Sequence, residues 1–152
     1  MILDRIVHLI ENQSQDLTGH VVQRLRDSFA TPKYGNLPRE ELWQSVHEVH
    51  RHLGNWLMTK DEPDLARRFL RIGMEWARQN VPFGQVVAAT VLIKVNLWEF
   101  LKKRDAEERP GTACGEAEML QMLSEFFDRV FYYLAIGYDR RSTGLRDEKK
   151  AA

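Results

Sequence analysis

Apolar residues recur at every third or fourth position along most of the chain, and no segment alternates apolar and polar residues long enough to form a β-strand. This spacing places apolar side chains on one face of an α-helix. The chain has 152 residues, which is enough for one domain with a sizeable core. We therefore predict an all-α fold, a single-domain bundle of about six helices within residues 1–138.

The apolar spacing also predicts where the helices lie. A short helix is expected at residues 2–10, and a second one, capped by Ser14, carries an apolar stripe from Leu17 to Phe29. Residues 31–38, with two prolines and a glycine, predict a loop. Four further helices are expected, from residue 38 to the segment TKDEP, at about 64–80, at about 83–104 and at about 116–138. Residues 139–152 are charged and lack apolar spacing, so we expect a disordered tail.

Pro82 separates two of these helices. Proline lacks a backbone N–H and disfavours the helical conformation at the preceding residue, Val81. Asn80 is a suitable helix terminator, so the two helices should form a hairpin with a very short turn. Gly73, in the middle of the first of them, lowers helix stability by about 1 kcal/mol relative to alanine. We expect it to allow a close approach to a neighbouring helix.

Charge and composition exclude several classes of protein. Lys and Arg number 22 and Asp and Glu number 22, whereas a dedicated nucleic-acid binder usually has a basic excess. The single cysteine, Cys114, excludes an internal disulfide and fits a reducing compartment. Residues 81–101 form a long apolar run, but Lys94, Asn96 and Glu99 would be costly in a bilayer. We expect a cytoplasmic protein that binds neither nucleic acid nor membrane.

Histidines on the third expected helix are candidates for a metal or haem site. His47 and His50 are three residues apart, so both could face one metal ion or haem iron. His50 lies beside the apolar stripe, where a haem ligand could sit, while no Cys/His spacing supplies the further ligands that zinc needs. We interpret these residues and His52 as partly buried or surface histidines, and we predict no metal and no cofactor. A haem-binding sensor with His50 as the ligand is the alternative.

The fourth expected helix has a basic face made of Arg67, Arg68, Arg71 and Arg78. Glu75 has the spacing to pair with two of these arginines, which favours a salt-bridged face over an anion site. No sequence neighbour of Cys114 would lower its pKa, and the chain has no serine elbow, no glycine-rich phosphate loop and no zinc-protease helix. We therefore predict that the protein is not an enzyme.

The last expected helix carries two apolar sets. One set has core spacing and includes Leu120, Leu123, Phe127, Val130, Phe131 and Leu134, and the second consists of Met119, Met122, Phe126 and Tyr133. One face is enough for a monomer core, and a second face left in water would be a larger apolar patch than monomers usually expose. Methionine and aromatic residues suit interfaces. We predict a homodimer through the second set, extended by Ile2 and Ile6 of the first helix.

Two stretches resemble a known family. They are FLRIGMEWARQNVPFGQVVAATVLIKVNLWEFL at residues 69–101 and FFDRVFYYLAIGYDRR at residues 126–141. The Gly73 helix with its Ala-Arg-Gln end, the Val81-Pro82 corner, the apolar helix that ends at Trp98 and the closing helix up to Tyr138 resemble the N-terminal sensory domains of RsbT co-antagonist proteins. These are the RsbR-type subunits of bacterial stressosomes, and similar input domains precede kinases.

The resemblance implies an all-helical, globin-like fold without haem, and a dimer. It also implies a non-catalytic sensory or regulatory input domain of stress signalling, which binds another signalling protein or output domain. In that family the last helix leads into a STAS output domain that meets RsbT and RsbS-type partners, whereas here a charged segment follows Tyr138. A haem- or small-ligand-binding sensor and a helical adaptor are the alternatives that stay open.

Overall fold

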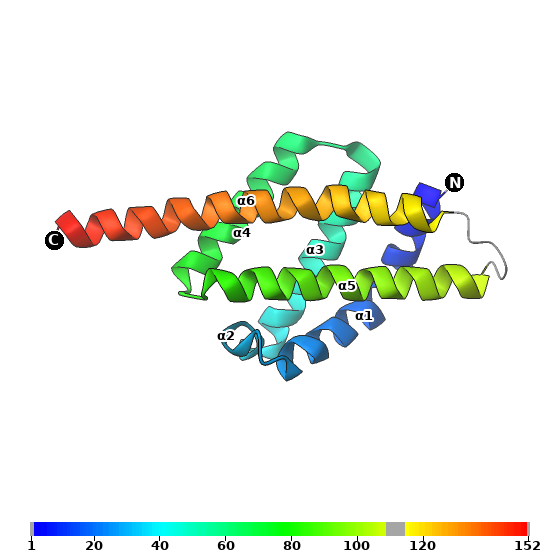
Figure 1. The fold of residues 1–152 in the computed structure, drawn as a ribbon, viewed down its shortest axis with the longest axis horizontal. Helices are drawn as coiled ribbons and strands as arrows, with labels where there is room; N and C mark the ends of the chain where they lie inside the picture. The colour runs from blue at the N-terminus through cyan, green and yellow to red at the C-terminus, as the bar shows by residue number, and fades with distance from the viewer. Residues whose placement is uncertain (1, 109–114, 152) are drawn as a thin grey trace.

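The computed structural model describes residues 2–108 and 115–151, so Cys114 and the adjoining residues of its loop lie outside the described part. Within that part the chain forms six α-helices and no strand (Figure 1). The helices are α1 (Ile2–Asp27), α2 (Pro32–Gly35), α3 (Arg39–Thr59), α4 (Glu62–Arg78), α5 (Phe83–Glu108) and α6 (Glu116–Ala151). The prediction of an all-α bundle is confirmed.

The first helix differs from the expectation of two helices. α1 is one continuous helix of 26 residues, and Ser14 lies inside it. Polar residues 11–16 interrupt the apolar pattern, but they are exposed or half-buried, and polar side chains that face solvent do not break a helix. Ile10 and Leu17, on either side of them, are buried at 3% and 2% exposure. Phe29 lies beyond the end of α1 and is 97% exposed, so its predicted place in the core stripe is wrong.

The segment expected to be a loop between α1 and α3 contains a short helix, α2, which buries Tyr34. The next two helices meet at a tight turn in which Lys60 has a φ of 52°. α4 begins at Glu62, slightly earlier than expected, because the Asp61 side chain caps it and accepts a hydrogen bond of 3.1 Å from the backbone N–H of Asp64.

The corner between α4 and α5 agrees with the prediction from Pro82. Asn80 adopts a left-handed conformation with a φ of 58° and ends the α4 segment, as asparagine often does. Val81 follows it and is fully buried, and its backbone N–H donates to the carbonyl of Trp76 at 3.1 Å. The hydroxyl of Tyr138 donates to the carbonyl of Val81 at 2.7 Å, which fastens α6 to this corner.

α4 and α6 cross at two glycines. A Cβ atom on Gly73 would collide with the backbone carbonyl of Leu134, and a Cβ atom on Gly137 would collide with the backbone carbonyl of Leu70. The two backbones are therefore in direct contact, and the predicted close approach at Gly73 is confirmed. The contact is reciprocal because each helix supplies one glycine to it.

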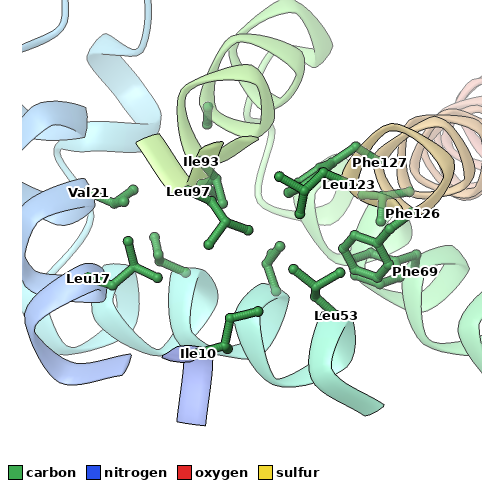
Figure 2. Close-up of a cluster of buried hydrophobic side chains, with 14 of the residues drawn as sticks. Ile10, Leu17, Val21, Leu53, Phe69, Ile93, Leu97, Leu123, Phe126 and Phe127 are labelled. Atoms are coloured by element: carbon green, nitrogen blue, oxygen red, sulfur yellow. The ribbon is translucent and has the colours of Figure 1, made fainter. Parts of the chain in front are cut away.

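One hydrophobic core joins the long helices. Figure 2 shows Ile10, Leu17 and Val21 of α1 converging with Leu53 of α3, Phe69 of α4, Ile93 and Leu97 of α5, and Leu123, Phe126 and Phe127 of α6. Phe126 packs edge to face against both Phe69 and Phe127, with ring centroids 6.0 and 5.1 Å apart. Such pairs add about 0.5–1.5 kcal/mol to the gain from burial.

α5 supplies much of this core. Among the described helices it is the only one long and apolar enough to cross a membrane by length and composition, over Phe83–Glu107 with a mean hydropathy of 1.3. Core helices pass the same test, and Val86, Ile93 and Leu97 of α5 are buried at 1% exposure or less. These three residues of α5 thus belong to the core of the bundle, whereas Val91 and Val95 are exposed.

α6 has 36 residues and continues past Tyr138, where the sequence predicted its end, to Ala151. Figure 1 shows its C-terminal part projecting beyond the other helices. A helical backbone at residues 139–151 differs from the disordered tail that we expected. This segment lacks proline, and its three arginines, two lysines, one glutamate and one alanine favour helix. An existing helix also extends at low cost. The division into a domain at residues 1–138 and a separate tail stays a prediction.

Candidate functional site

The residues predicted for a dimer contact lie mainly inside the single chain. Ile6 and Phe126 are 0% exposed and Met119 is 1% exposed, so a second copy could reach them only if the core opened. Met122 and Tyr133 are half-buried, and the side chain of Ile2 lies outside the described part.

The physical reason is the wide buried arc of α6, which has contacts with α3, α4 and α5. Phe126 lies against Trp56 of α3 and Phe69 of α4, at centroid distances of 6.0 Å in both cases. Leu120, which the sequence analysis assigned to the core, is instead 43% exposed. Met119 and Phe126 therefore belong to the core of the single chain, and the homodimer itself stays a prediction.

Tyr133 has a structural partner at the start of α4. Its hydroxyl donates to Glu62 Oε1 at 2.6 Å, and Arg129 Nε donates to Glu62 Oε2 at 2.7 Å. The hydrogen bond from Tyr133, together with Arg129, lowers the pKa of the Glu62 carboxyl below its usual range. These three residues clamp the N-terminal end of α4 onto α6.

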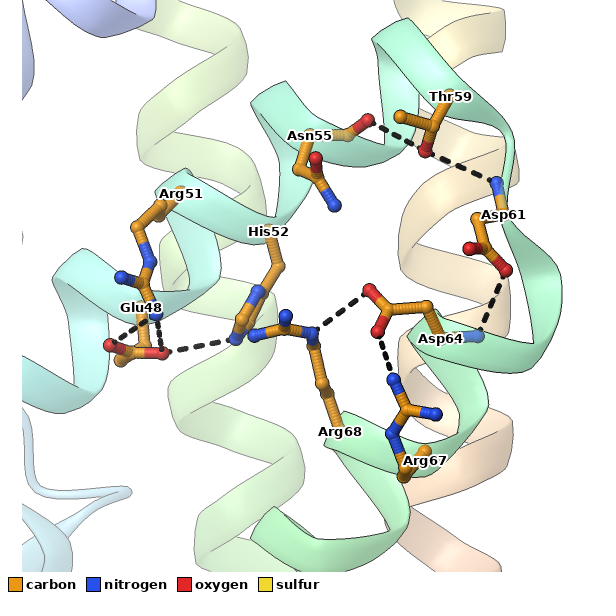
Figure 3. A network of polar contacts seen from close by, with 9 residues as sticks. All are labelled: Glu48, Arg51, His52, Asn55, Thr59, Asp61, Asp64, Arg67 and Arg68. Atoms are coloured by element: carbon orange, nitrogen blue, oxygen red, sulfur yellow. Dashed lines mark hydrogen bonds and ion pairs between the residues drawn. The ribbon is translucent and has the colours of Figure 1, made fainter.

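The basic face of α4 is salt-bridged at Arg67, Arg68 and Arg78. Of the two pairs predicted for Glu75, the one with Arg78 is present among the described residues. Figure 3 shows Arg67 and Arg68 both directed at Asp64, and Arg68 Nε lies 2.9 Å from Asp64 Oδ2. At the end of α4, Arg78 Nε donates to Glu75 Oε2 at 2.9 Å. These arginines are satisfied by carboxylates of their own helix, so the face is not an anion site built from four free guanidinium groups.

His50 and His52 of α3 lie in different surroundings. His52 is buried, and its Nε2 atom lies 3.0 Å from a carboxylate oxygen of Glu48 (Figure 3). The His52 ring is edge-on to Phe69. His50 is 1% exposed, and its Nδ1 atom lies 3.2 Å from the hydroxyl of Thr18 on α1. Burial, with a smaller effect of His47, lowers the pKa of His50 to about 4. These two residues are thus more deeply buried than we predicted.

His47 and His50 border a groove of about 410 Å³ between α1 and α3. The Nδ1 atom of His47 and the Nε2 atom of His50 are buried there without a hydrogen-bond partner among the described residues. No group of three His, Cys, Asp or Glu side chains suited to a metal ion occurs in the described part of the chain. The groove therefore supplies two imidazoles, fewer than the ligands of a usual zinc site.

A second cavity, which we call the central cavity, lies between α2, α3, α4, α5 and α6 and has a volume of about 320 Å³. Its buried walls are Val49, Phe69, Trp76, Ile93, Val130 and Leu134. Its remaining lining includes the exposed or half-buried polar residues Glu41, Ser45, Glu48, Glu75 and Gln79, which place its opening between α3 and α4. The cavity is apolar inside and polar at its mouth.

Two further polar groups lie in the wall of the central cavity. The Tyr34 hydroxyl is 3.3 Å from the hydroxyl of Ser45, and burial raises the pKa of Tyr34 to about 12, so it stays protonated at neutral pH. The Thr90 hydroxyl donates to the carbonyl of Val86 at 2.8 Å. The lining residues include no histidine and no cysteine, and no side chain there pairs a nucleophile with a base. This arrangement can bind a small molecule.

Comparison with known proteins gives one family. The family model described as RsbT co-antagonist protein rsbRD N-terminal domain matches residues 15–151. The chain belongs to this family. No curated protein and no solved structure matches the chain. The resemblance that residues 69–101 and 126–141 indicated is confirmed.

Membership assigns the chain to a family of regulatory sensory domains in stress signalling. In this rsbRD-type N-terminal domain, the central cavity is the feature that sequence reasoning missed. Its signal was weak, because Tyr34 belongs to a segment predicted as a loop, and Ser45 and Thr90 interrupt apolar helix faces without forming a motif. Only the packing of five helices brings these residues together.

Proposed function

We propose that this domain is a non-catalytic input module of bacterial stress signalling that works in the cytoplasm as a globin-like homodimer. It passes its signal through α6 to another signalling protein or output domain. The observation that carries this proposal is the family match over residues 15–151. The long α6 supports it, because this helix contacts the core and also projects from the bundle (Figure 1).

Exposed apolar side chains on α5 and α6 support pairing with a second copy. Four large apolar side chains are exposed there, Val91, Val95, Leu120 and Tyr132, with exposed fractions of 43, 41, 43 and 61%. α5 and α6 contact each other and lie side by side in Figure 1. Two such helices from each copy can form a four-helix bundle about a two-fold axis, which buries an apolar patch against its own equivalent.

The test is the oligomeric state of the full chain and of a variant with Val95→Glu and Tyr132→Glu. We expect the wild type to be a dimer at high micromolar concentration in light scattering, and the variant to be a monomer with unchanged helical circular dichroism. Met58→Glu is the matched control, since Met58 is 62% exposed on α3. A monomeric wild type, or a variant that stays dimeric, would contradict this contact.

The haem alternative has less support. His50 contacts α1 and borders the groove between α1 and α3, while the larger apolar walls belong to the central cavity, whose lining includes no histidine. Expression with haem supplied is the direct test. A Soret band that disappears in His50→Ala would establish haem binding and overturn our proposal on this point.

A further inference from the structure

The central cavity raises the question of what such a sensory module detects. We propose that it is the ligand site and that it holds one small molecule with an apolar body, about the size of a bicyclic ring, and a positively charged end. This inference rests on the proposed sensory function and gives it a ligand class. The body lies against the buried walls, and the charged end lies at the mouth between α3 and α4.

The volume of the cavity sets the size of the ligand. A dry cavity of about 150 Å³ lined by aliphatic and aromatic side chains takes up benzene. The central cavity has about 320 Å³, which is enough for two fused rings with a short side chain. Ligand pockets in proteins are typically apolar cavities from about 300 Å³ upward with a few polar groups, so the central cavity falls at the lower end of that range.

The chemistry of the walls selects an apolar body. Phe69, Trp76 and Ile93 are buried at 1, 6 and 1% exposure and come from two helices. Tyr34 packs on Trp76 with ring centroids 4.6 Å apart, which holds the indole in place as a flat wall. The hydroxyls of Ser45 and Tyr34 border the same space and can bond a single polar atom of the ligand.

The charged residues at the mouth determine which charge the outer end of the ligand should carry. Glu41, Glu48 and Glu75 line the opening, whereas no cationic side chain lines it. Arg51 pairs with Glu48 and Arg78 pairs with Glu75, yet both arginines lie outside the lining. The two arginines thus offset part of the negative charge from outside the opening, while the groups that face an entering molecule are carboxylates, which favours a cation over an anion at this end.

The position of the cavity connects a ligand to α6. Val130 and Leu134 of α6 form part of its buried wall. The backbone of Leu134 is also the group that Gly73 of α4 approaches at the helix crossing. A molecule in the cavity thus touches α6 next to its closest contact with the rest of the bundle.

Calorimetric titration of the full chain with three related probes tests this inference. Tryptamine is a cation at pH 7, indole is neutral and indole-3-acetate is an anion, and all three carry the same bicyclic ring. We expect tryptamine to bind at least tenfold more tightly than indole-3-acetate, with indole between them. Absence of binding by all three probes would overturn the ligand site, and equal affinities for the three would overturn the charged end.

Two variants on α4 locate the binding. Ile72 is half-buried and lines the cavity, so Ile72→Trp should fill it and weaken tryptamine binding at least tenfold. Met74 lies on the same helix, does not line the cavity and is 41% exposed, so Met74→Trp should leave the affinity within twofold. Equal affinities in both variants would show that the probe binds elsewhere.

Failure of this inference is separable from failure of the proposed function. The mass of the wild type and of the Val95→Glu, Tyr132→Glu variant reports on dimerisation without any probe. If the chain is a dimer that binds none of the probes, the input module stands and the ligand site is wrong. If tryptamine binds to a chain that is always a monomer, the ligand site stands and the dimer is wrong.

Discussion

His50 is an ionisable group that the fold keeps uncharged. It is 1% exposed, and burial lowers its pKa from 6.5 to about 4. Glu48 does not pair with it, because that carboxylate lies beside His52 instead. Val46 and Leu53 lie one helical turn before and after His50, and these apolar residues indicated an apolar setting for it from the sequence alone. The contact with Thr18 on α1 could not be read from the sequence, because the two residues are 32 positions apart.

We predict that His50 makes the protein less stable in acid. Between pH 6.5 and 4 the unfolded chain binds a proton at this histidine and the folded chain does not. The free energy of unfolding therefore falls as the pH falls, by at most about 1.4 kcal/mol per pH unit. His50→Gln should give a shallower loss of stability over this range in urea titrations at several pH values.

Two other histidines define the control for this measurement. His52 also has a lowered pKa, mainly through burial, so part of the acid destabilisation should remain in His50→Gln. His20 is exposed on α1, and His20→Gln should keep the wild-type pH dependence. If the variants at positions 50 and 20 have the same slope, His50 is not the group responsible.

At the scale of the elements, the tightest contact between two helices at any described glycine is the crossing of α4 and α6. Gly73 and Gly137 each face a backbone carbonyl of the other helix. Added side-chain atoms at such a place force a backbone shift, and overpacking of this kind costs about 1–3 kcal/mol. Better helix propensity, worth about 1 kcal/mol for alanine over glycine, offsets only part of that cost.

We therefore predict that Gly73→Ala and Gly137→Ala each lower the melting temperature. Gly54→Ala is the matched control, because Gly54 lies in α3 and a Cβ atom there would have no neighbour within 4 Å. That control should be stabilised by roughly 0.5–1 kcal/mol through helix propensity alone. Thermal unfolding followed by circular dichroism measures all three, and a rise at position 73 equal to that at position 54 would contradict the close packing.

The elements also show which parts of the fold a sequence can predict. The corner at Pro82 was predictable because proline and asparagine restrict their own backbone, and Gly73 was predictable because a glycine inside a helix needs a packing reason. The orientation of α6 was not, since Phe126 and Leu120 are equally apolar and only the positions of α3 and α4 decide which is buried. The continuity of α1 through residues 11–16 was not predictable either, because it depends on the tertiary packing of Ile10 and Leu17 before and after this polar segment.

At the scale of the whole molecule, the end of α6 should add little to folding. Arg141 follows the last contacts of α6 named above, which are Gly137 at the crossing and Tyr138 at the corner. The segment beyond it contains one large apolar residue, Leu145. We predict that truncation after Arg141 leaves the melting temperature unchanged, because little apolar surface there compensates the loss of chain entropy.

Tyr138→Phe serves as the positive control for that truncation. It removes the hydroxyl that donates to the carbonyl of buried Val81 at 2.7 Å, and a buried acceptor left without a partner costs about 1–3 kcal/mol. A clear drop in melting temperature is expected for Tyr138→Phe and none for the truncation. A truncated chain that melts as early as Tyr138→Phe would show that the end of α6 docks on the bundle.

The glycine crossing also has a mechanical consequence. α6 is a single rod, and the crossing at Gly137 divides it into an inner arm inside the bundle and an outer arm of 14 residues up to Ala151. At 1.5 Å per residue the outer arm is about 21 Å long. If α6 pivots at this crossing by about 5°, the far end of the outer arm moves by about 2 Å, whereas the backbones in contact at the crossing barely move. A small displacement of Val130 or Leu134 on the inner arm is thus converted into a larger swing outside the bundle.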